Sequence, residues 1–475
     1  MADAARGVCL FCSLGCGLSI ESQDGEPLAL EYDQASAVNE GTLCAKGNYL
    51  LELLNHRRRL AEPRIGGSVV SWQQAAASLA NLLRSPSTAL IVEGDLSDEE
   101  ARLLPSFAAS CMESDNWAVN FSTGDDEVLR ALESVPVPEA STDDLRESAC
   151  TVAVGDPFSV GPVVARHVMH ARNASRDHRL HVVRDDRHEN VAARFAQIDL
   201  GGGLREGLLA LLHAILTLPD RSAPGWSRPI VEEIARTGGP PAVDEVQAVA
   251  AQFANAQSGV LVVSTADPVA AQLAGCCALA AGERKRFSLV HDYGNAAGIC
   301  RSVAPPTTAQ DILDRAARGA VDALCVLGAD PVAALPDRDV EGGLKGLRRL
   351  AAGAVLPNRT TTLADTALPT SVWLEKHGTF NGSMRSAAAE PVGAARSYGE
   401  IMHLVAQVRG VNLHPYSGRT APPVQDMSPE LARAMVHQAR EPAPATGVRS
   451  TAVRFGDGAL TDMLSFPQAI RTQAV

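Results

Sequence analysis

The chain has 475 residues, of which 46% are hydrophobic and 20% charged, values typical of a folded globular protein with two to four domains. Its formal net charge of −13 argues against a nucleic-acid backbone as the main partner. No stretch approaches the roughly 18 uninterrupted apolar residues of a transmembrane helix, and no apolar or twin-arginine leader opens the sequence, so we expect a cytoplasmic protein.

Four cysteines gather near the N-terminus, at Cys9, Cys12, Cys16 and Cys44, separated in turn by two, three and twenty-seven residues. A cuboidal iron–sulfur cluster needs one thiolate at each of its irons, which a tight loop with three ligands and a distant fourth can supply. A structural zinc site also takes four thiolates, but usually from two similar short pairs. The spacing therefore favours a [4Fe-4S] cluster, with zinc and unrelated buried cysteines as the alternatives.

Residues 18–32 predict two short strands around a turn at Asp24-Gly25. This antiparallel hairpin brings the segment that holds Cys44 back beside the loop that holds the other cysteines. Further on, Ser71 predicts the N-cap of an amphipathic helix that reaches about Arg84.

An apolar run that ends in a Gly/Asp turn and is followed by a helix recurs along the chain. Strands buried on both faces read as continuous apolar runs, and their alternation with helices predicts parallel βαβ units. The runs are 89–95, 151–157, 260–268 and 323–331, and the expected helices are 97–110, 161–173, 203–217, 269–282 and 308–318. The fold class is therefore α/β, with ligands expected beyond the carboxyl ends of the strands.

Two of these turns are near-copies, since Asp156-Pro157 and Asp330-Pro331 lie 174 residues apart. Each follows a glycine, Gly155 or Gly328. A single copy is typical of an ordinary turn and helix cap. Their repetition at the ends of two predicted strands favours a shared role in binding a ligand.

With its cysteine spacing, Lys46 just after the fourth cysteine and these two turns, the chain resembles the molybdopterin (bis-pterin guanine dinucleotide) oxidoreductases. That family includes formate dehydrogenases, the pterin-binding chain of formylmethanofuran dehydrogenase and the large iron–sulfur subunit of respiratory complex I. Residues 361–369 and 375–385 are similar to the family segment ADVVLP…EKxGTFxNxEGR, and the resemblance covers about residues 7–408. It implies a small N-terminal iron–sulfur domain followed by two interleaved Rossmann-like parallel-sheet domains.

The resemblance also implies roles for particular residues. Lys46 would lie between the cluster and a pterin, although a solvated lysine is the commoner meaning of such a residue. Asp186 and Arg187 would contact the ribose and phosphate of the nucleotide, although the proline that the family has at this place is missing. A surface ion pair between them is the alternative. The positions implied to bind a molybdopterin guanine dinucleotide with Mo or W are Gly155, Asp156, Pro157, Asp186, Arg187, Gly294, Asn295, Gly328, Asp330, Pro331, His377, Thr379 and Asn381.

The sequence departs from the family in two places. In catalytic members a Cys, selenocysteine or Ser that binds the metal follows an Asn-x-Asp element, but residues 116–126 contain no cysteine. Ser122 and His377 are the remaining catalytic candidates. Residues 409–475 are too short for the family's C-terminal cap domain, and we expect an extended or helical tail that binds a partner, with one helix at 428–440.

The predicted organisation is a cluster domain at 1–63, a discontinuous Rossmann-like domain at 64–146 and 320–408, a second at 147–319, and the tail. The predicted function is that of an iron–sulfur subunit in a redox complex, with formate/CO2 or formyl-group chemistry implied by the resemblance. Its partners would be other redox subunits, including a separate cap subunit. The alternatives are a non-catalytic electron-conducting scaffold without Mo or W and a zinc-binding accessory protein.

Overall fold

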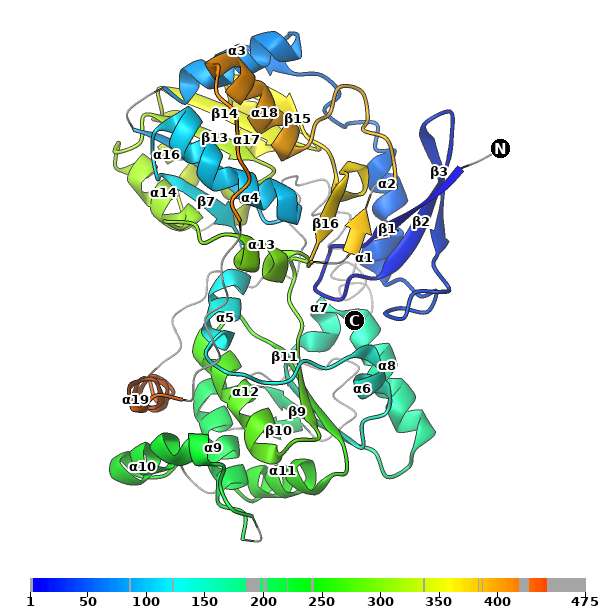
Figure 1. Ribbon diagram of the computed structural model, residues 1–475, viewed down its shortest axis with the longest axis vertical. Helices are drawn as coiled ribbons and strands as arrows, with labels where there is room; N and C mark the ends of the chain where they lie inside the picture. The colour runs from blue at the N-terminus through cyan, green and yellow to red at the C-terminus, as the bar shows by residue number, and fades with distance from the viewer. Residues whose placement is uncertain are drawn as a thin grey trace, which may run out of the picture.

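The structure is a computed structural model of the chain, shown in Figure 1. It describes residues 3–84, 87–121, 124–184, 197–199, 203–219, 221–240, 243–335, 338–382, 384–386, 388–417 and 427–441. Three of the predicted site residues, Ser122, Asp186 and Arg187, lie outside the described residues.

The N-terminal region is a three-stranded antiparallel sheet in the order β1-β2-β3. Its strands are β1 (Asp3–Val8), β2 (Gly17–Gln23) and β3 (Glu26–Tyr32), and the short helices α1 (Ala45–Asn48) and α2 (Leu50–Leu54) follow. Asp24 and Gly25 both have positive φ, as a two-residue hairpin turn requires, so the predicted hairpin is confirmed. Leu18 and Ile20 are fully buried beneath the sheet.

A seven-stranded mixed sheet has the order β5-β4-β15-β14-β13-β6-β7. Its strands are β4 (Arg64–Ile65), β5 (Ser68–Val69), β6 (Thr88–Glu93), β7 (Trp117–Asn120), β13 (Ala323–Leu327), β14 (Arg349–Ala354) and β15 (Thr366–Pro369). The strands from β7 to β15 run parallel, while β4 and β5 add an antiparallel edge. The direction of winding reverses between β6 and β13, which makes the carboxyl ends of these two strands a topological switch point.

Helices cover both faces of this sheet (Figure 1). One face carries α3 (Trp72–Leu82), α4 (Asp98–Phe107) with its π-helical end η1 (Ala108–Met112), and α18 (Tyr398–Arg409). The other carries α14 (Ala309–Ala317) and α16 (Val340–Lys345). The remaining elements of this half are α13 (Ala296–Ser302), α15 (Pro331–Ala334), α17 (Arg359–Leu363), η4 (Trp373–Glu375) and the hairpin β16 (Gly378–Phe380) and β17 (Met384–Ser386).

A five-stranded parallel sheet has the order β10-β9-β8-β11-β12. Its strands are β8 (Cys150–Gly155), β9 (Arg179–Arg184), β10 (Gln197–Asp199), β11 (Gly259–Ser264) and β12 (Lys285–Leu289). This is the 3-2-1-4-5 order of nucleotide-binding sheets, with its switch point between β8 and β11.

The five-stranded sheet is also covered on both faces. The larger apolar layer contains α9 (Leu204–Leu216), α11 (Asp244–Asn255) and α12 (Pro268–Ala281), and the other contains α6 (Thr142–Arg146) and α8 (Pro162–Ala174). The remaining elements are α5 (Asp125–Leu132), α7 (Pro157–Val160), η3 (Gly225–Ser227), α10 (Arg228–Thr237) and α19 (Pro429–Gln438). The predicted alternation of parallel strands and helices is confirmed.

The helix predicted in the tail is present as α19, but it is bound within the chain. Ala432, Met435 and Val436 are buried in the apolar core of the five-stranded half. Arg205, on α9, donates to the carbonyl of Gln438 at 3.1 Å. That face of the helix is therefore covered by the chain itself. Partner binding by the tail remains a proposal, and so do the domain boundaries at 63, 146, 319 and 408.

None of the helices in the described part of the chain combines the length and apolar character needed to cross a membrane.

Candidate functional site

Three of the four N-terminal cysteines lie on the loop that joins β1 to β2. The Cys9 N–H donates to the Cys16 carbonyl at 2.9 Å, which continues the ladder between the strands and closes the loop around Cys12. Cys44 is the N-cap of α1, where the chain turns back toward this loop. The hairpin therefore places both cysteine segments at one end of the small sheet, as predicted.

The four thiols lie within electrostatic range of one another. Burial raises the pKa of the Cys9 thiol, and the neighbouring Cys12 and Cys44 raise it further. Burial also raises the pKa of Cys12 to about 11 and that of Cys16 well above its usual range. Such thiols carry charge only when a positive group shares their site, so this donor set fits a metal centre that binds thiolates.

In the described part of the chain, no three His, Cys, Asp or Glu side chains lie close enough together to hold a single metal ion. A single zinc ion brings its sulfurs to about 2.3 Å from one point. A four-iron cluster instead takes one thiolate at each corner, so its ligands stand further apart.

The loop after β12 packs directly on the cysteine loop. The Ser13 N–H donates to the His291 carbonyl at 2.9 Å, and the Gly294 N–H donates to the Leu10 carbonyl at 3.0 Å. A Cβ atom on Gly294 would lie 2.7 Å from the Leu10 Cα and 3.0 Å from the Cys12 carbonyl oxygen. Only glycine permits this approach, which gives Gly294 a role in holding the cysteine loop.

Lys46 connects the cysteine segment to the five-stranded half. Its Nζ donates to the Val160 carbonyl at 2.9 Å and lies 3.7 Å from Asp292 Oδ1. Burial alone would lower the pKa of Lys46, but Asp292 and the thiols of Cys12 and Cys44 together raise it. Burial raises the pKa of Asp292 to about 6 in spite of the lysine. Lys46 is therefore a partly buried cation beside the thiols, with its side chain 12% exposed, and not a solvated surface lysine.

The two Gly-Asp-Pro-like turns occupy equivalent places in the two larger sheets. Gly155 ends β8 and Gly328 follows β13, and their φ values are 73° and 84°. In each turn the aspartate caps a short helix, Asp156 accepting from the Ser159 N–H and Asp330 from the Ala333 N–H. The structure thus places each turn at a topological switch point, where open α/β sheets bind ligands.

The carboxyl edge of the seven-stranded sheet has several buried polar atoms that find no hydrogen-bond partner among the described residues. These atoms follow three adjacent parallel strands and are Asp330 Oδ2, Asn358 Nδ2, Thr370 Oγ1 and Ser371 Oγ. All four residues are at most 5% exposed. Buried polar groups are normally paired, so this edge fits a ligand that offers both donors and acceptors. The pKa of Asp330 is raised by burial.

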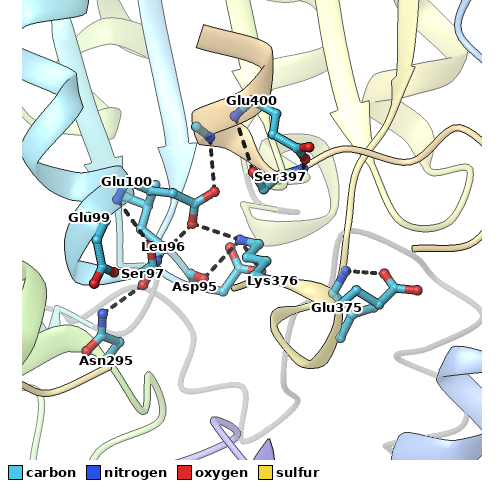
Figure 2. A network of polar contacts seen from close by, with 12 residues as sticks. Asp95, Leu96, Ser97, Glu99, Glu100, Asn295, Glu375, Lys376, Ser397 and Glu400 are labelled. Atoms are coloured by element: carbon cyan, nitrogen blue, oxygen red, sulfur yellow. Dashed lines mark hydrogen bonds and ion pairs between the residues drawn. The ribbon is translucent and has the colours of Figure 1, made fainter. Parts of the chain in front are cut away.

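The loop from β6 to α4 at the same switch point is held by a buried polar network (Figure 2). Lys376 Nζ donates to the Asp95 carbonyl at 3.1 Å and lies 3.3 Å from Glu100 Oε2. It also lies 3.8 Å from the ring centroid of Tyr398. Burial raises the pKa of Asp95. This network joins the residues after η4 to the seven-stranded sheet. Lys376 therefore helps to hold the fold together.

Two predicted site residues, Asn295 and Asn381, make hydrogen bonds in the same region. Asn295 is fully buried, and its Nδ2 donates to the Leu96 carbonyl at 2.7 Å and to Asp98 Oδ1 at 3.0 Å. Its Oδ1 accepts from the Asn381 N–H at 2.5 Å. These bonds hold the Asn295 side chain within the protein, and they explain why Asn381 can keep a positive φ of 51°.

The other predicted residues of this segment differ in their surroundings. The Thr379 N–H donates to Glu99 Oε2 at 2.8 Å, whereas His377 is exposed. Residues 116–126, where catalytic members of the family carry the metal ligand, include β7, in which Asn120 Nδ2 donates to Glu93 Oε2 at 2.8 Å. Cys111 lies apart from it in η1, buried, with its thiol pKa raised by burial to about 11. The described residues of this stretch add no thiolate.

Sequence reasoning missed several residues of this region. Asp292 lies two residues before Gly294, which the sequence identified, and a carboxylate beside that glycine was the available signal. Asn358, Thr370 and Ser371 carried no motif, because each follows a strand whose neighbours in the sheet only the fold reveals.

Comparison with known proteins gives a family match at the N-terminus. Residues 3–56 match the molybdopterin oxidoreductase Fe4S4 domain. Over most of its length the chain is similar to the F420-dependent formate dehydrogenase subunit alpha of Methanocaldococcus jannaschii, with 23% identity over 454 residues. That match covers 80% of this chain and 65% of the relative, so the chain spans just under two thirds of the relative's length.

Two solved structures share the fold. Acetylene hydratase from Pelobacter acetylenicus superposes with a TM-score of 0.64 at 15% identity, covering 90% of this chain and 72% of that one. A chain of the formyltransferase/hydrolase complex from Methylorubrum extorquens gives a TM-score of 0.52 at 14% identity, covering 73% of this chain and 98% of that one. Relatives of this chain are thus subunits of multi-subunit complexes.

Proposed function

Because the chain belongs to the molybdopterin oxidoreductase family, with its Fe4S4 domain at residues 3–56, we propose that it is the electron-transferring iron–sulfur subunit of an oxidoreductase complex. The observation that carries this proposal is the set of four thiols at one end of the N-terminal sheet, with the partly buried Lys46 beside them. A [4Fe-4S] cluster held there by Cys9, Cys12, Cys16 and Cys44 would accept and release one electron at a time.

The protein's own groups would set the properties of this centre. These thiols are costly to ionise while the site holds no cluster, and they become stable thiolates once a cluster balances their charge. Lys46 adds a positive charge that favours the reduced cluster, and Asp292 and the Val160 carbonyl fix the position of its ammonium group. Gly294 keeps the loop after β12 in contact with the cysteine loop and so limits access of water.

A pterin guanine dinucleotide is the ligand that we propose for the edge of the seven-stranded sheet. When bound, such a cofactor supplies two-electron chemistry at Mo or W through its dithiolene group. Asp330 Oδ2 is suited to accept an N–H of its guanine, and Asn358 Nδ2 to donate to an oxygen. The turn of Gly155, Asp156 and Pro157 would serve the equivalent half, and Lys46 bridges toward that turn through Val160.

One-carbon chemistry, either formate/CO2 or the redox chemistry of a formyl carrier, is the substrate class that we propose. It is supported by the similarity to a formate dehydrogenase subunit over 80% of this chain. Partner subunits would supply the cap over the cofactor and the onward path for electrons.

A second candidate is a subunit that conducts electrons without Mo or W. The observation that favours it is the lack of a cysteine in residues 116–126, where catalytic members of the family carry the metal ligand. A zinc-binding accessory protein is the third candidate, since zinc also accepts four thiolates.

Analysis of metals and pterin in the anaerobically purified full chain tests these candidates. About four iron per chain with Mo or W and oxidised pterin fluorescence supports a catalytic subunit. Iron alone assigns the chain to electron conduction, and zinc without iron overturns both redox proposals.

A further inference from the structure

Electrons that reach the cluster need a route to or from a partner, and the four cysteines differ in their access to solvent. Cys9, Cys12 and Cys16 are at most 6% exposed, whereas Cys44 is only partly buried and its neighbour Ala45 is exposed. The side of the cluster at Cys44 is therefore the side nearest to the surface.

The surface beside Cys44 is the edge strand β3, which Figure 1 shows at the outer margin of the small sheet, away from both larger sheets. Leu28 and Tyr32 on this strand are 54% and 45% exposed. Leu28 sits at a β-bulge, where the pairing of β3 with β2 shifts register. Bulges re-aim side chains and disrupt edge pairing, so this one turns an apolar side chain outward.

Tyr32 is linked to the cluster segment by hydrogen bonds. Its hydroxyl donates to Asn48 Oδ1 at 2.7 Å, and Asn48 Nδ2 donates to the Cys44 carbonyl at 3.0 Å. An exposed aromatic ring is thereby fixed in place and joined to the backbone of a predicted cluster ligand. Such a ring, apolar with a bonded hydroxyl, is a typical anchor of protein interfaces.

The charged side chains of this surface are acidic. Residues 17–40 contain six acidic residues and no basic one. Glu31 is exposed on β3, Glu21 is on the neighbouring strand, and Asp33 follows Tyr32. Glu40 belongs to a different contact, since it pairs with Arg146 and Arg166 of the same chain.

Apart from Lys46, whose ammonium group contacts the Val160 carbonyl and Asp292, the basic residues of the region lie away from the Tyr32 end of β3. Arg6 is on β1, the opposite edge strand of the sheet. Arg57 and Arg58 follow Asn55, whose Nδ2 donates to the Pro27 carbonyl near the other end of β3. Near Cys44 the exposed ring of Tyr32 is thus flanked by the carboxylates of Glu31 and Asp33, whereas Leu28 lies toward the other end of β3.

We propose that this β3 surface, formed by Leu28, Glu31, Tyr32 and Asp33, docks a basic one-electron carrier protein that exchanges electrons with the cluster on the side of Cys44. The proposal rests on the presence of the cluster. The carboxylates attract and orient a basic partner, and the exposed apolar side chains form the centre of the contact. One electron passes from the reduced cluster to the carrier's oxidised centre, and no atom or proton is transferred.

Stopped-flow oxidation of the dithionite-reduced full chain, freed of excess reductant, tests this with ferric mitochondrial cytochrome c as the basic carrier. The wild-type rate constant is expected to fall steeply as salt is raised, because the attraction is screened. Glu21→Gln/Glu31→Gln is expected to lower the low-salt rate about three- to tenfold and to flatten its salt dependence. Leu28→Ser is expected to lower the rate at high salt as well.

The matched control is Glu232→Gln/Glu430→Gln, which removes the same charge from exposed positions on α10 and α19. It is expected to react like the wild type, and ferricyanide, a small anion, should oxidise every variant without loss of rate. Equal slowing by both charge pairs, or no slowing by either, overturns the docking proposal. A chain that lacks the cluster's visible absorption overturns the proposed function instead, so the two failures are distinguishable.

Discussion

Lys46 Nζ lies 3.7 Å from Asp292 Oδ1, an ion pair between the cysteine segment and the loop after β12. The same ammonium group donates to the carbonyl of Val160, in the short helix that follows the Gly155-Asp156-Pro157 turn. A single side chain therefore contacts the segments that we propose to hold the cluster and one end of the cofactor. This arrangement makes Lys46 the first residue to test for control of the cluster's potential.

Replacing Lys46 with Met should lower the midpoint potential of the cluster by roughly tens of millivolts. The variant loses a positive charge whose interaction with the extra electron is on the order of 1 kcal/mol at partly buried sites. A redox titration followed by electron paramagnetic resonance measures the change. Lys46→Arg is the control, since it keeps the charge, and equal potentials in Met, Arg and wild-type proteins contradict an electrostatic role.

The buried pair of Arg59 and Glu375 should matter for stability. Its two hydrogen bonds measure 2.6 and 2.7 Å, and the side chains are 2% and 0% exposed. Glu375→Gln leaves the guanidinium charge buried without a counter-charge and should reduce the free energy of unfolding by about 3 kcal/mol.

Urea unfolding measures this change. The double variant Arg59→Met/Glu375→Leu should recover part of the loss, because it removes both charges. A loss below about 1 kcal/mol in Glu375→Gln contradicts the assignment of a fully buried pair.

Asp330→Asn tests the edge of the seven-stranded sheet. The amide can still accept from the Ala333 N–H, but it replaces one carboxylate oxygen with a donor and so loses an acceptor for a guanine N–H. The pterin content of the purified chain should fall several-fold while the iron content stays constant.

Asp339→Asn is the matched control, because Asp339 also caps a helix of this half but is exposed. Equal pterin content in the wild type and both variants contradicts a nucleotide contact at Asp330.

His178 should contribute to the pH dependence of stability. It is 7% exposed, and burial lowers its pKa from 6.5 to about 4, with smaller effects from Arg172 and His181. The unfolded chain therefore binds a proton between these pH values that the folded chain does not, so this contribution is present above pH 6.5 and is lost as the pH falls.

From pH 7 to pH 5 the loss from this one group should be about 2 kcal/mol. Denaturant unfolding at several pH values measures it, and His178→Asn, which does not titrate, should show a shallower decline. Parallel declines in both proteins contradict a neutral buried histidine.

The sequence predicted the parts of the fold that depend on local pattern. The Asp24-Gly25 turn sets the register of the hairpin, and the four apolar runs all became buried parallel strands. The near-copies at Asp156-Pro157 and Asp330-Pro331 were placed correctly at strand ends, because glycine and proline act locally on the backbone.

Other features depend on contacts that a single sequence does not reveal. The packing of Gly294 on Leu10 joins residues 284 positions apart, and the Lys376 network joins three distant segments. Asn295 matched a family loop, but its hydrogen bonds to Leu96 and Asp98 became visible only in the folded chain.

The assignment of the four cysteines to a cluster is tested by the iron and acid-labile sulfide content of the anaerobically purified chain, combined with low-temperature electron paramagnetic resonance after reduction. We expect about four iron and four sulfide per chain and the signal of a reduced [4Fe-4S] cluster, both lost in Cys12→Ala. Zinc in place of iron, or the same iron content and signal in the Cys12 variant, would contradict the assignment of the four cysteines to a cluster.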